Sequence, residues 1–236
     1  KRQYDEAIQE AKQAIAYNPA NYAGWYWLGE AYYHKAQYRE AIPAFRKVLE
    51  RNPSGAASAI TLNNSYFYLG WSYFHMDSDD EAIRYFNGAL ERDPDYVGAL
   101  QGRGMAYYRK GRFGDSKKDF DRASKFTESD DKSSLNALLR YKAFSYLGLG
   151  DADTAISLIK QAKAASDYDT SGDLARVYYA SGDKEKALQA LGGRIDVSIK
   201  DYKKGALNGA EIDAVQEGGA GEAAGLLKGD VVVQFN

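Results

Sequence analysis

The chain has no cysteine and no long apolar run. The absence of cysteine among 236 residues excludes disulfide frameworks and cysteine-bound zinc. No uninterrupted apolar stretch approaches the roughly 18 residues that a membrane-spanning helix needs. We therefore expect no membrane insertion. No signal peptide is visible, and Lys1 already lies inside a patterned helix, so we expect the chain to begin within a structural unit.

Neither sign of charge dominates. The formal net charge is -2 and the isoelectric point is about 5.8, so the chain offers no broad basic surface for phosphate backbones, and nucleic acid is disfavoured as a partner. Hydrophobic residues make up 44% and charged residues 27%, which is typical of a folded globular protein. Aromatic residues are unusually numerous, with 20 tyrosines and 3 tryptophans. So many large rings must either pack inside the fold or form a binding surface.

One order of residues recurs with a period of 34, the distance from Pro19 to Pro53. The first complete copy consists of Trp25, Leu28, Gly29, Tyr32, Tyr38, Ala41, Phe45 and Pro53. The second copy consists of Tyr66, Leu69, Gly70, Tyr73, Ala82, Phe86, Ala89 and Pro94. The second half alone stands at the start, as Tyr4, Ala7, Ala11, Ala14 and Pro19. The pattern resembles the tetratricopeptide repeat, in which pairs of helices stack because one pair cannot bury its apolar face alone.

Weaker copies continue the pattern from Val97, from about Asn136 and from Leu174. We therefore predict a mostly α fold, an α-solenoid over residues 1–192, with one leading helix and five helix pairs. Extra residues at about 56–62 would lengthen one helix by nearly two turns, and about five more precede Asn136. Pro43 falls inside a predicted helix, where it should kink the helix or weaken one turn.

The pattern changes at residues 194–236. Ile195, Val197 and Ile199 alternate as in a strand, and a second strand is predicted within 205–215. The stretch Ala224-Gly225-Leu226-x-x-Gly229-Asp230-Val231 resembles the middle of a PDZ domain, a small α/β module that binds peptides by strand addition. The resemblance stops short of the helix that closes the peptide groove, and Asp196 stands where that family usually has glycine. We predict a truncated or degenerate PDZ-like module; a small β cap on the solenoid is the alternative.

In the tetratricopeptide family, ligands usually lie in a concave groove lined by the first helix of each pair. The resemblance assigns the following residues of this chain to that groove: Tyr26, Glu30, Tyr33, His34, Phe67, Trp71, Phe74, His75, Gln101, Met105, Tyr108, Arg109, Arg140, Phe144, Leu147, Arg176 and Tyr179. Aromatic patches of this kind mark interaction sites. The alternative is that some of these rings pack against a neighbouring repeat instead.

The same positions restrict the ligand. Family members that bind chaperone C-termini need lysine and asparagine where this chain has Tyr26 and Glu30, so such a ligand is not expected. Arg109, Arg140 and Arg176 could hold acidic side chains. The expected partner is therefore a protein or peptide segment with aromatic or aliphatic anchors and some acidic residues.

No catalytic or cofactor motif accompanies the repeats. His34 and His75 share one position in successive units, and Glu30 lies one turn before His34. Equivalent positions should lie on the order of 10 Å apart, which is long for a shared metal, so we expect no metal and no cofactor. Acidic clusters before predicted helices are explained by helix capping. We predict that the chain is not an enzyme.

The sequence favours a scaffold or adaptor that binds a partner segment in the groove. Two alternatives stay open: a structural subunit that stacks through its convex face or ends, and the regulatory arm of an enzyme whose catalytic domain is outside this chain. The PDZ-like stretch is similar to those of bacterial envelope proteins. It favours a bacterial, periplasmic location over a cytoplasmic one.

Overall fold

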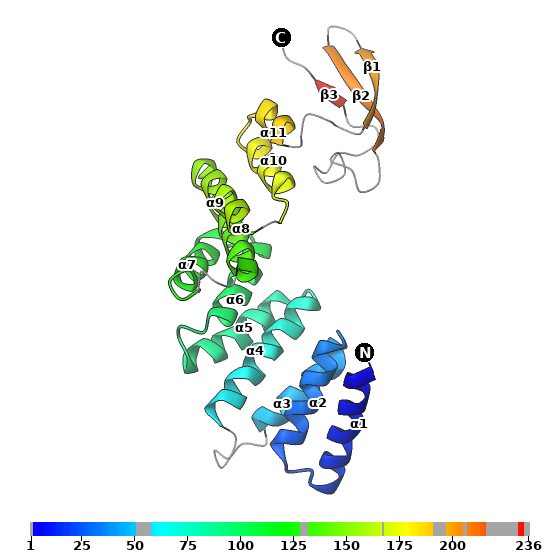
Figure 1. Cartoon of the computed structure of the whole chain (residues 1–236), viewed down its shortest axis with the longest axis vertical. Coiled ribbons are helices and arrows are strands. Elements are labelled where there is room, and N and C mark those ends of the chain that lie inside the picture. Colours follow the sequence, from blue (N-terminus) through cyan, green and yellow to red (C-terminus); the bar gives the residue numbers. More distant parts are fainter. Residues whose placement is uncertain are drawn as a thin grey trace. The chain divides into compact units, whose positions relative to one another are not determined.

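A computed structural model describes residues 2–50, 58–127, 132–166, 168–190, 197–204, 207–215 and 231–233. Those residues contain eleven helices, which are labelled in Figure 1. The helices are α1 (Arg2–Tyr17), α2 (Tyr22–His34), α3 (Tyr38–Glu50), α4 (Ala59–His75), α5 (Asp79–Arg92), α6 (Val97–Arg109), α7 (Phe113–Ala123), α8 (Lys132–Gly148), α9 (Ala152–Ala165), α10 (Ser171–Ala180) and α11 (Lys184–Ala190). The described helices thus run as one leading helix, α1, followed by five helix pairs.

The helices fall into two compact units, Lys1–Asp131 and Lys132–Asn236. The first unit holds α1 and the pairs α2/α3, α4/α5 and α6/α7, and the second begins with the pairs α8/α9 and α10/α11. Within the first unit the first helices of successive pairs also touch, α2 against α4 and α4 against α6. This contact between pairs is what stacks helix hairpins into a repeat array.

Each pair is joined by a tight turn that needs one residue in the left-handed region. Gly111, Gly150 and Gly182 supply a positive φ in the last three pairs, and they do so without steric cost. The first two pairs instead place Ala36 (φ 57°) and Asp77 (φ 55°) there. A β-carbon in this region costs free energy, so these two turns depend on the packing around them.

The same packing anchor holds each pair of the first unit together. Phe45, Phe86 and Phe120, from the second helices, are fully buried. Each ring lies on a glycine of the preceding helix. A β-carbon added to Gly29 would come within 2.9 Å of the Phe45 ring, and one added to Gly70 within 2.6 Å of the Phe86 ring. Glycine is therefore required because the ring takes the space of the side chain.

α4 is lengthened, as the extra residues at about 56–62 predicted, and α8, for which no lengthening was predicted, is as long. α4 and α8 have 17 residues each, against 13 in α2 and α6. The α4 extension begins at Ala59 behind Ser58, whose hydroxyl accepts a hydrogen bond from the Thr61 backbone N–H, 3.1 Å away, and so caps the helix. Pro43 does not end α3, which continues to Glu50.

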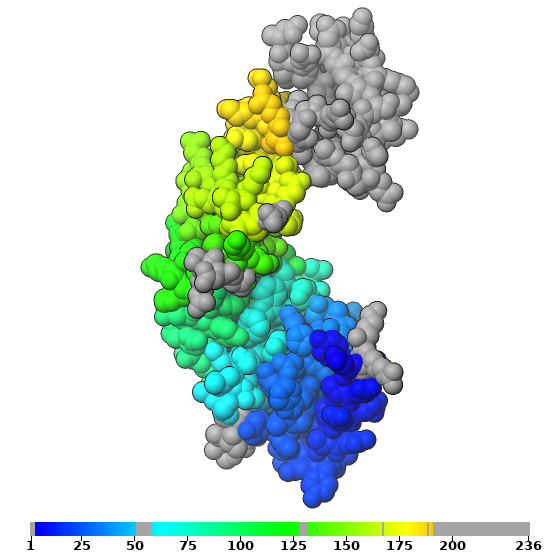
Figure 2. All heavy atoms as spheres, viewed as in Figure 1, coloured from blue at the N-terminus to red at the C-terminus, as the bar shows by residue number. Residues whose placement is uncertain are grey.

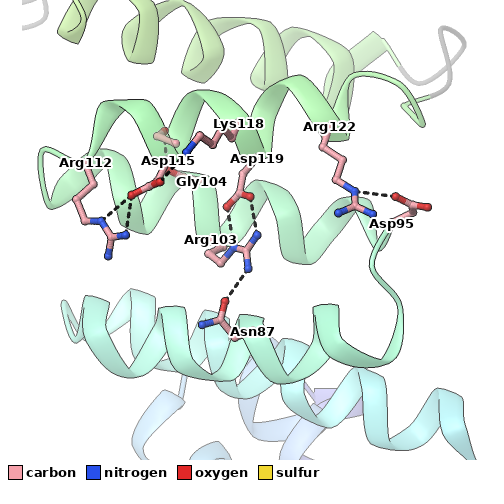
Figure 3. A network of polar contacts seen from close by, with 10 residues as sticks. Asn87, Asp95, Arg103, Gly104, Arg112, Asp115, Lys118, Asp119 and Arg122 are labelled. Carbon is pink, nitrogen blue, oxygen red and sulfur yellow. Dashed lines mark hydrogen bonds and ion pairs between the residues drawn. The ribbon is translucent and has the colours of Figure 1, made fainter.

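A network of polar contacts holds the last pair of the first unit together (Figure 3). Arg103 of α6 donates two hydrogen bonds to Asp119 of α7, at 2.7 and 2.6 Å, and a third to Asn87 of α5, at 2.6 Å. Asp119 is buried. Burial raises the pKa of Asp119, while the hydrogen bonds from Arg103 act in the opposite direction. One guanidinium thus ties three helices.

The second unit also contains a three-stranded sheet. Its strands are β1 (Val197–Lys204), β2 (Leu207–Val215) and β3 (Val231–Val233), in the order β1-β2-β3 with both pairs antiparallel. The predicted strands at 194–200 and 205–215 correspond to β1 and β2. Residues 216–230, which carry most of the PDZ-like stretch, and Asp196 lie outside the described residues.

Candidate protein-interaction surface

Three predicted groove residues end the first helices of the first unit. His34 is the last residue of α2, His75 of α4 and Arg109 of α6. All three residues are exposed, and the Arg109 side chain itself is about one third exposed, at 30%. Because they occupy one repeat position, the fold presents them at one edge of successive helix pairs. That edge is where the sequence predicted a ligand, and the residues around it decide what it can bind.

Ring contacts join these three positions into a continuous strip. Tyr4 stacks on His34 with ring centroids 5.5 Å apart, and Tyr33, beside His34, lies 6.4 Å from His75. His75 lies 5.8 Å from Trp71, and Trp71 lies 5.4 Å from Phe74. We call this strip the ring row: Tyr4, His34, Tyr33, His75, Trp71 and Phe74, with Arg109 over the last ring. It runs from α1 across α2 and α4 to α6.

The imidazole of His75 is held between two rings. Tyr38 stacks on it at 4.5 Å and Trp71 covers it at 5.8 Å. Partial burial lowers the pKa of His75, and the nearby Arg109 cation lowers it further. His75 is therefore neutral at pH 7, with one ring nitrogen as donor and the other as acceptor. A neutral imidazole at an exposed edge can bond to the backbone of a bound segment.

Arg109 closes the row and is already engaged within the chain. It donates to Asp79 at 2.9 Å, to Asp77 at 2.9 Å and to the Phe74 carbonyl at 2.9 Å. Its guanidinium also lies 3.9 Å from the centre of the Phe74 ring. These hydrogen bonds hold α6 against the turn after α4. The N–H groups of Arg109 that form them are not available to the carboxylates of a partner.

Two other predicted groove residues are packed between repeats. Tyr26 lies 6.5 Å from Tyr68 of α4, and its hydroxyl accepts a hydrogen bond from Asn64 at 3.4 Å. The Tyr68 hydroxyl donates to the Glu30 carboxylate at 3.2 Å. Burial also raises the pKa of Tyr33 to about 12. Tyr26, Glu30 and the buried side of the Tyr33 ring therefore contact the neighbouring repeat, as the alternative to groove binding proposed.

The remaining predicted residues of the first unit are half-buried. Phe67 lies between Tyr68 and Tyr96, at 5.3 and 5.1 Å. Gln101 and Met105 lie along α6. Tyr108 lies 5.6 Å from Phe113. The ring of Phe67 also lies 6.3 Å from that of Trp71 and so backs the ring row from the inside.

The second unit holds its predicted arginines in pairs. Arg140 of α8 makes a two-pronged ion pair with Asp173 of α10, and its guanidinium lies 4.2 Å from the Tyr168 ring. Arg176 lies 4.7 Å from the ring of Phe144, which is buried. Leu147 is half-buried, whereas Tyr179 is exposed. Both arginines therefore have partners inside the unit.

A hollow that sequence reasoning missed opens between α1 and α2. Its volume is about 680 Å³, and its lining combines small residues with Tyr4, Trp27, Glu10, Glu30 and His34. The Trp27 side chain is 59% exposed although it is large and apolar. The sequence could have indicated this hollow through Ala11, a small residue at the repeat position where later repeats have Phe45 and Phe86.

Neither a metal cluster nor a membrane-spanning helix occurs among the described residues. They hold no group of three or more histidine, cysteine, aspartate or glutamate side chains placed to share a metal. His34 stacks on Tyr4 rather than turning to Glu30. Among those residues no helix has the length and apolar character that crossing a membrane requires.

Comparison with known proteins supports the repeat. Residues 1–57 and 64–96 each match a family model described as tetratricopeptide repeat. The small glutamine-rich tetratricopeptide repeat-containing protein 2 of Saccharomyces cerevisiae is 34% identical over 59 residues. That match covers 25% of this chain and 17% of the yeast protein, so the chain spans less than a fifth of this relative.

Solved structures show the same fold at low identity. The crystal structure of MamA superposes with a TM-score of 0.59 at 21% identity, over 69% of this chain and 88% of that one. PilW, titled a widely conserved type IV pilus biogenesis factor, gives 0.63 at 20% identity, over 81% of this chain and 84% of its own. The chain thus contains tetratricopeptide repeats and has their helical fold.

Proposed function

We propose that this chain is a non-catalytic protein-interaction scaffold that binds a segment of a partner protein along the ring row. Proteins built from tetratricopeptide repeats generally act as interaction scaffolds, which supports the general class. The observation that carries the specific proposal is the unbroken ring contact from Tyr4 to Arg109, with His34 and His75 exposed along it. A packing role alone would not require polar rings at that edge.

The chemistry of the row indicates the kind of segment it takes. Aromatic faces bind apolar side chains and other rings. The neutral imidazole of His75 supplies one donor and one acceptor for the backbone of an extended segment. Arg109, Arg140 and Arg176 all have partners within the chain, so the proposal assigns binding to apolar anchors and leaves the acidic residues expected in the partner as a secondary prediction.

The proposal is tested by capture from a lysate of the source organism with three immobilised proteins. The first is the wild type and the second is His34→Ala/His75→Ala, which changes exposed side chains only. The control is Tyr17→Ala/Ile60→Ala, which removes two apolar side chains that are 94% and 72% exposed and lie outside the row. Melting curves must first show that all three are folded.

We expect the wild type and the control to retain the same partner and the histidine variant to lose at least about nine-tenths of it, because truncating an interface anchor weakens binding by tenfold or more. Equal capture by all three proteins contradicts the ring row as the binding surface. A partner lost only from the control would place binding elsewhere on the first unit.

Other predictions made from the sequence stand as proposals beside this one. The PDZ-like character of residues 194–236 and the bacterial envelope location belong here. The same holds for the partner's acidic residues. Each rests on its sequence pattern alone, and the captured partner and its compartment test the location.

A further inference from the structure

The arginines of α3 and α5 are exposed and form no ion pair with any residue that the structure describes. They are Arg39 and Arg46 of α3 and Arg84 and Arg92 of α5. The arginines of α6 and α7 are instead all paired with aspartates, as Arg122 is with Asp95 at 2.8 Å. Guanidinium groups that gather without counter-charges repel one another, so their placement on α3 and α5 decides whether they can share an anion.

Three tyrosine rings connect two of these cations. Tyr73, near the end of α4, stacks on Tyr85 of α5 with ring centroids 5.3 Å apart and an interplanar angle of 7°. The guanidinium of Arg84 lies 4.5 Å from the centre of the Tyr85 ring. Tyr85 also lies 6.4 Å from Tyr66, and the guanidinium of Arg92 lies 5.3 Å from the centre of the Tyr66 ring. The rings therefore hold Arg84 and Arg92 over one continuous aromatic floor.

Arg46 reaches the same floor from α3. Phe45 of α3 and Tyr85 of α5 belong to one buried cluster, so the two helices adjoin here. Burial raises the pKa of Tyr73, and the cations of Arg46 and Arg84 both act in the opposite direction, so both lie near one hydroxyl. The helices that carry this surface, α3 to α5, are coloured from blue to turquoise in Figure 2. We call the surface the arginine strip: Arg46, Arg84 and Arg92 with Tyr66, Tyr73 and Tyr85.

The next helix pair shows how the chain neutralises the same repeat position elsewhere. By repeat register, Arg84 corresponds to Lys118 and Glu81 to Asp115. Lys118 pairs with Asp115 at 3.5 Å. Glu81 forms no ion pair with a residue that the structure describes, and it is one carboxylate against two cations among the charged groups that act on Tyr73. The arginine strip thus keeps a positive charge that the chain itself does not neutralise.

The covered rings favour carboxylates over nucleobases as the anion. Single-stranded nucleic acid binds where its bases can stack on open aromatic faces. Tyr85 is only 8% exposed, with Tyr73 stacked on it and Arg84 over it. A guanidinium that lies on a ring still presents the N–H groups at its edge, which match the two oxygens of a carboxylate.

The spacing of the cations indicates the conformation of the ligand. Arg84 and Arg92 are eight residues apart on α5, which corresponds to about 12 Å along a helix axis. Residues four apart in an extended segment span about 13 Å and point to the same side. An extended segment with acidic residues at that spacing can therefore reach both arginines.

We propose that the arginine strip binds an extended, acidic segment of a partner protein. Carboxylates four residues apart in that segment pair with Arg84 and Arg92, and a third, near the first, pairs with Arg46 beside Tyr73. The arginine strip shares no residue with the ring row, so this second surface does not depend on the proposed function.

The test uses a dye-labelled peptide in which glutamate alternates with serine. The first control is the same peptide with lysine in place of glutamate. The second is a dye-labelled single strand of thymidine nucleotides with the same total charge as the glutamate peptide. Binding of each to the whole chain is measured by the anisotropy of the dye, at one fixed salt concentration.

The next helix pair supplies a matched control for the protein variants. Arg46→Gln/Arg84→Gln removes two positive charges from the arginine strip. Lys118→Gln/Arg122→Gln removes the same charge from exposed positions whose cations already have carboxylate partners. Melting curves must show that both variants are folded. Arg46→Gln alone leaves every ring contact of the arginine strip in place, and it serves as the test if the double variant does not fold.

We expect the glutamate peptide to bind the wild type and Lys118→Gln/Arg122→Gln alike, and Arg46→Gln/Arg84→Gln at least about tenfold more weakly. Arg46→Gln alone should weaken binding about threefold. Equal affinity of the two double variants overturns the proposal, as does a glutamate peptide that binds the wild type no better than the lysine peptide. Tighter binding of the nucleotide strand, abolished by Arg46→Gln/Arg84→Gln, would assign the arginine strip to nucleic acid and likewise overturn the acidic segment.

Discussion

The α2/α3 pair and the α6/α7 pair are built on the same anchor but are surrounded by different side chains. In both places a buried phenylalanine of a second helix, Phe45 or Phe120, lies on a glycine of the helix before it. Around Phe45 the neighbours are rings, among them Tyr26 and Tyr68. The α6/α7 pair instead carries polar contacts: the Arg103–Asp119 ion pair, and Ser116, whose hydroxyl donates to the Gly104 carbonyl at 2.7 Å.

The comparison separates the contact that the repeat fold requires from the side chains that vary between repeats of this chain. The ring over glycine fixes how two helices cross, and it recurs at every pair of the first unit. The surrounding side chains are free to vary, so α2–α5 hold a ring cluster that reaches the surface as the ring row, whereas α6–α7 hold a buried ion pair. Stability should therefore depend equally on both regions, and binding on the first alone.

The largest expected effect tests the shared anchor. Phe45→Ala and Phe120→Ala each remove a ring that is fully buried, and each should lower the free energy of unfolding by about 3–5 kcal/mol. Urea unfolding followed by circular dichroism measures both. A loss below about 1 kcal/mol in one of them would show that the two anchors are not equivalent.

The next effect separates the ionic region from the aromatic one. Arg103→Leu leaves the buried Asp119 carboxylate without its two strongest donors, and the free energy of unfolding should fall by about 3 kcal/mol. The double variant Arg103→Met/Asp119→Leu removes both charges and should regain most of that loss. If the single and double variants unfold at the same urea concentration, the carboxylate is not the source of the cost.

A smaller effect compares two glycines. Gly70→Ala forces a β-carbon to within 2.6 Å of the Phe86 ring, so we expect a loss of about 1–3 kcal/mol from overpacking. Gly114 lies in α7 with nothing within 4 Å of an added β-carbon, and Gly114→Ala should be neutral or stabilise by up to about 1 kcal/mol. Thermal melts of the two variants distinguish close approach from helix propensity, and equal shifts would contradict the ring-over-glycine account.

The smallest effect is the pH dependence of the ring row. Burial and Arg109 lower the pKa of His75 below its ordinary value. The neutral form is therefore favoured in the folded state, and stability is lost as the pH falls from about 6.5 through the lowered value, because the unfolded chain binds the proton more readily. His75→Gln should reduce the difference in melting temperature between pH 7.5 and pH 5. An unchanged pH profile in this variant would place the titration elsewhere.

Much of this architecture could be predicted from residues alone. The order Trp25, Leu28, Gly29 and Tyr32 placed α2, and its copies placed the later helices, because the small and large positions must alternate where helices cross. The longer α4 followed from counting residues against the repeat. Pro43 was the weaker prediction: it lies inside α3 without ending it, since it is exposed and so leaves the unbonded carbonyl one turn earlier near water.

The candidate surface was less accessible to sequence reasoning. The repeat position predicted that His34, His75 and Trp71 lie in the groove. It does not indicate which face of each ring packs against other side chains and which is exposed. Tyr26 and Glu30 shared the predicted groove positions and are used by Tyr68 and Asn64 instead. The engagement of Arg109 depends on Asp77 and Asp79 in a turn of the neighbouring pair. Such contacts between repeats follow from the stacking, which a single repeat does not encode.

The most direct test of the ring row uses the fact that the chain contains only two histidines, and both lie in it. Histidine-selective labelling with ¹³C gives one imidazole ring signal for each, recorded before and after addition of the captured partner segment. We predict that both signals shift together at the same partner concentration, because one segment lies across His34 and His75. Binding of the partner with both signals unmoved would contradict the central claim.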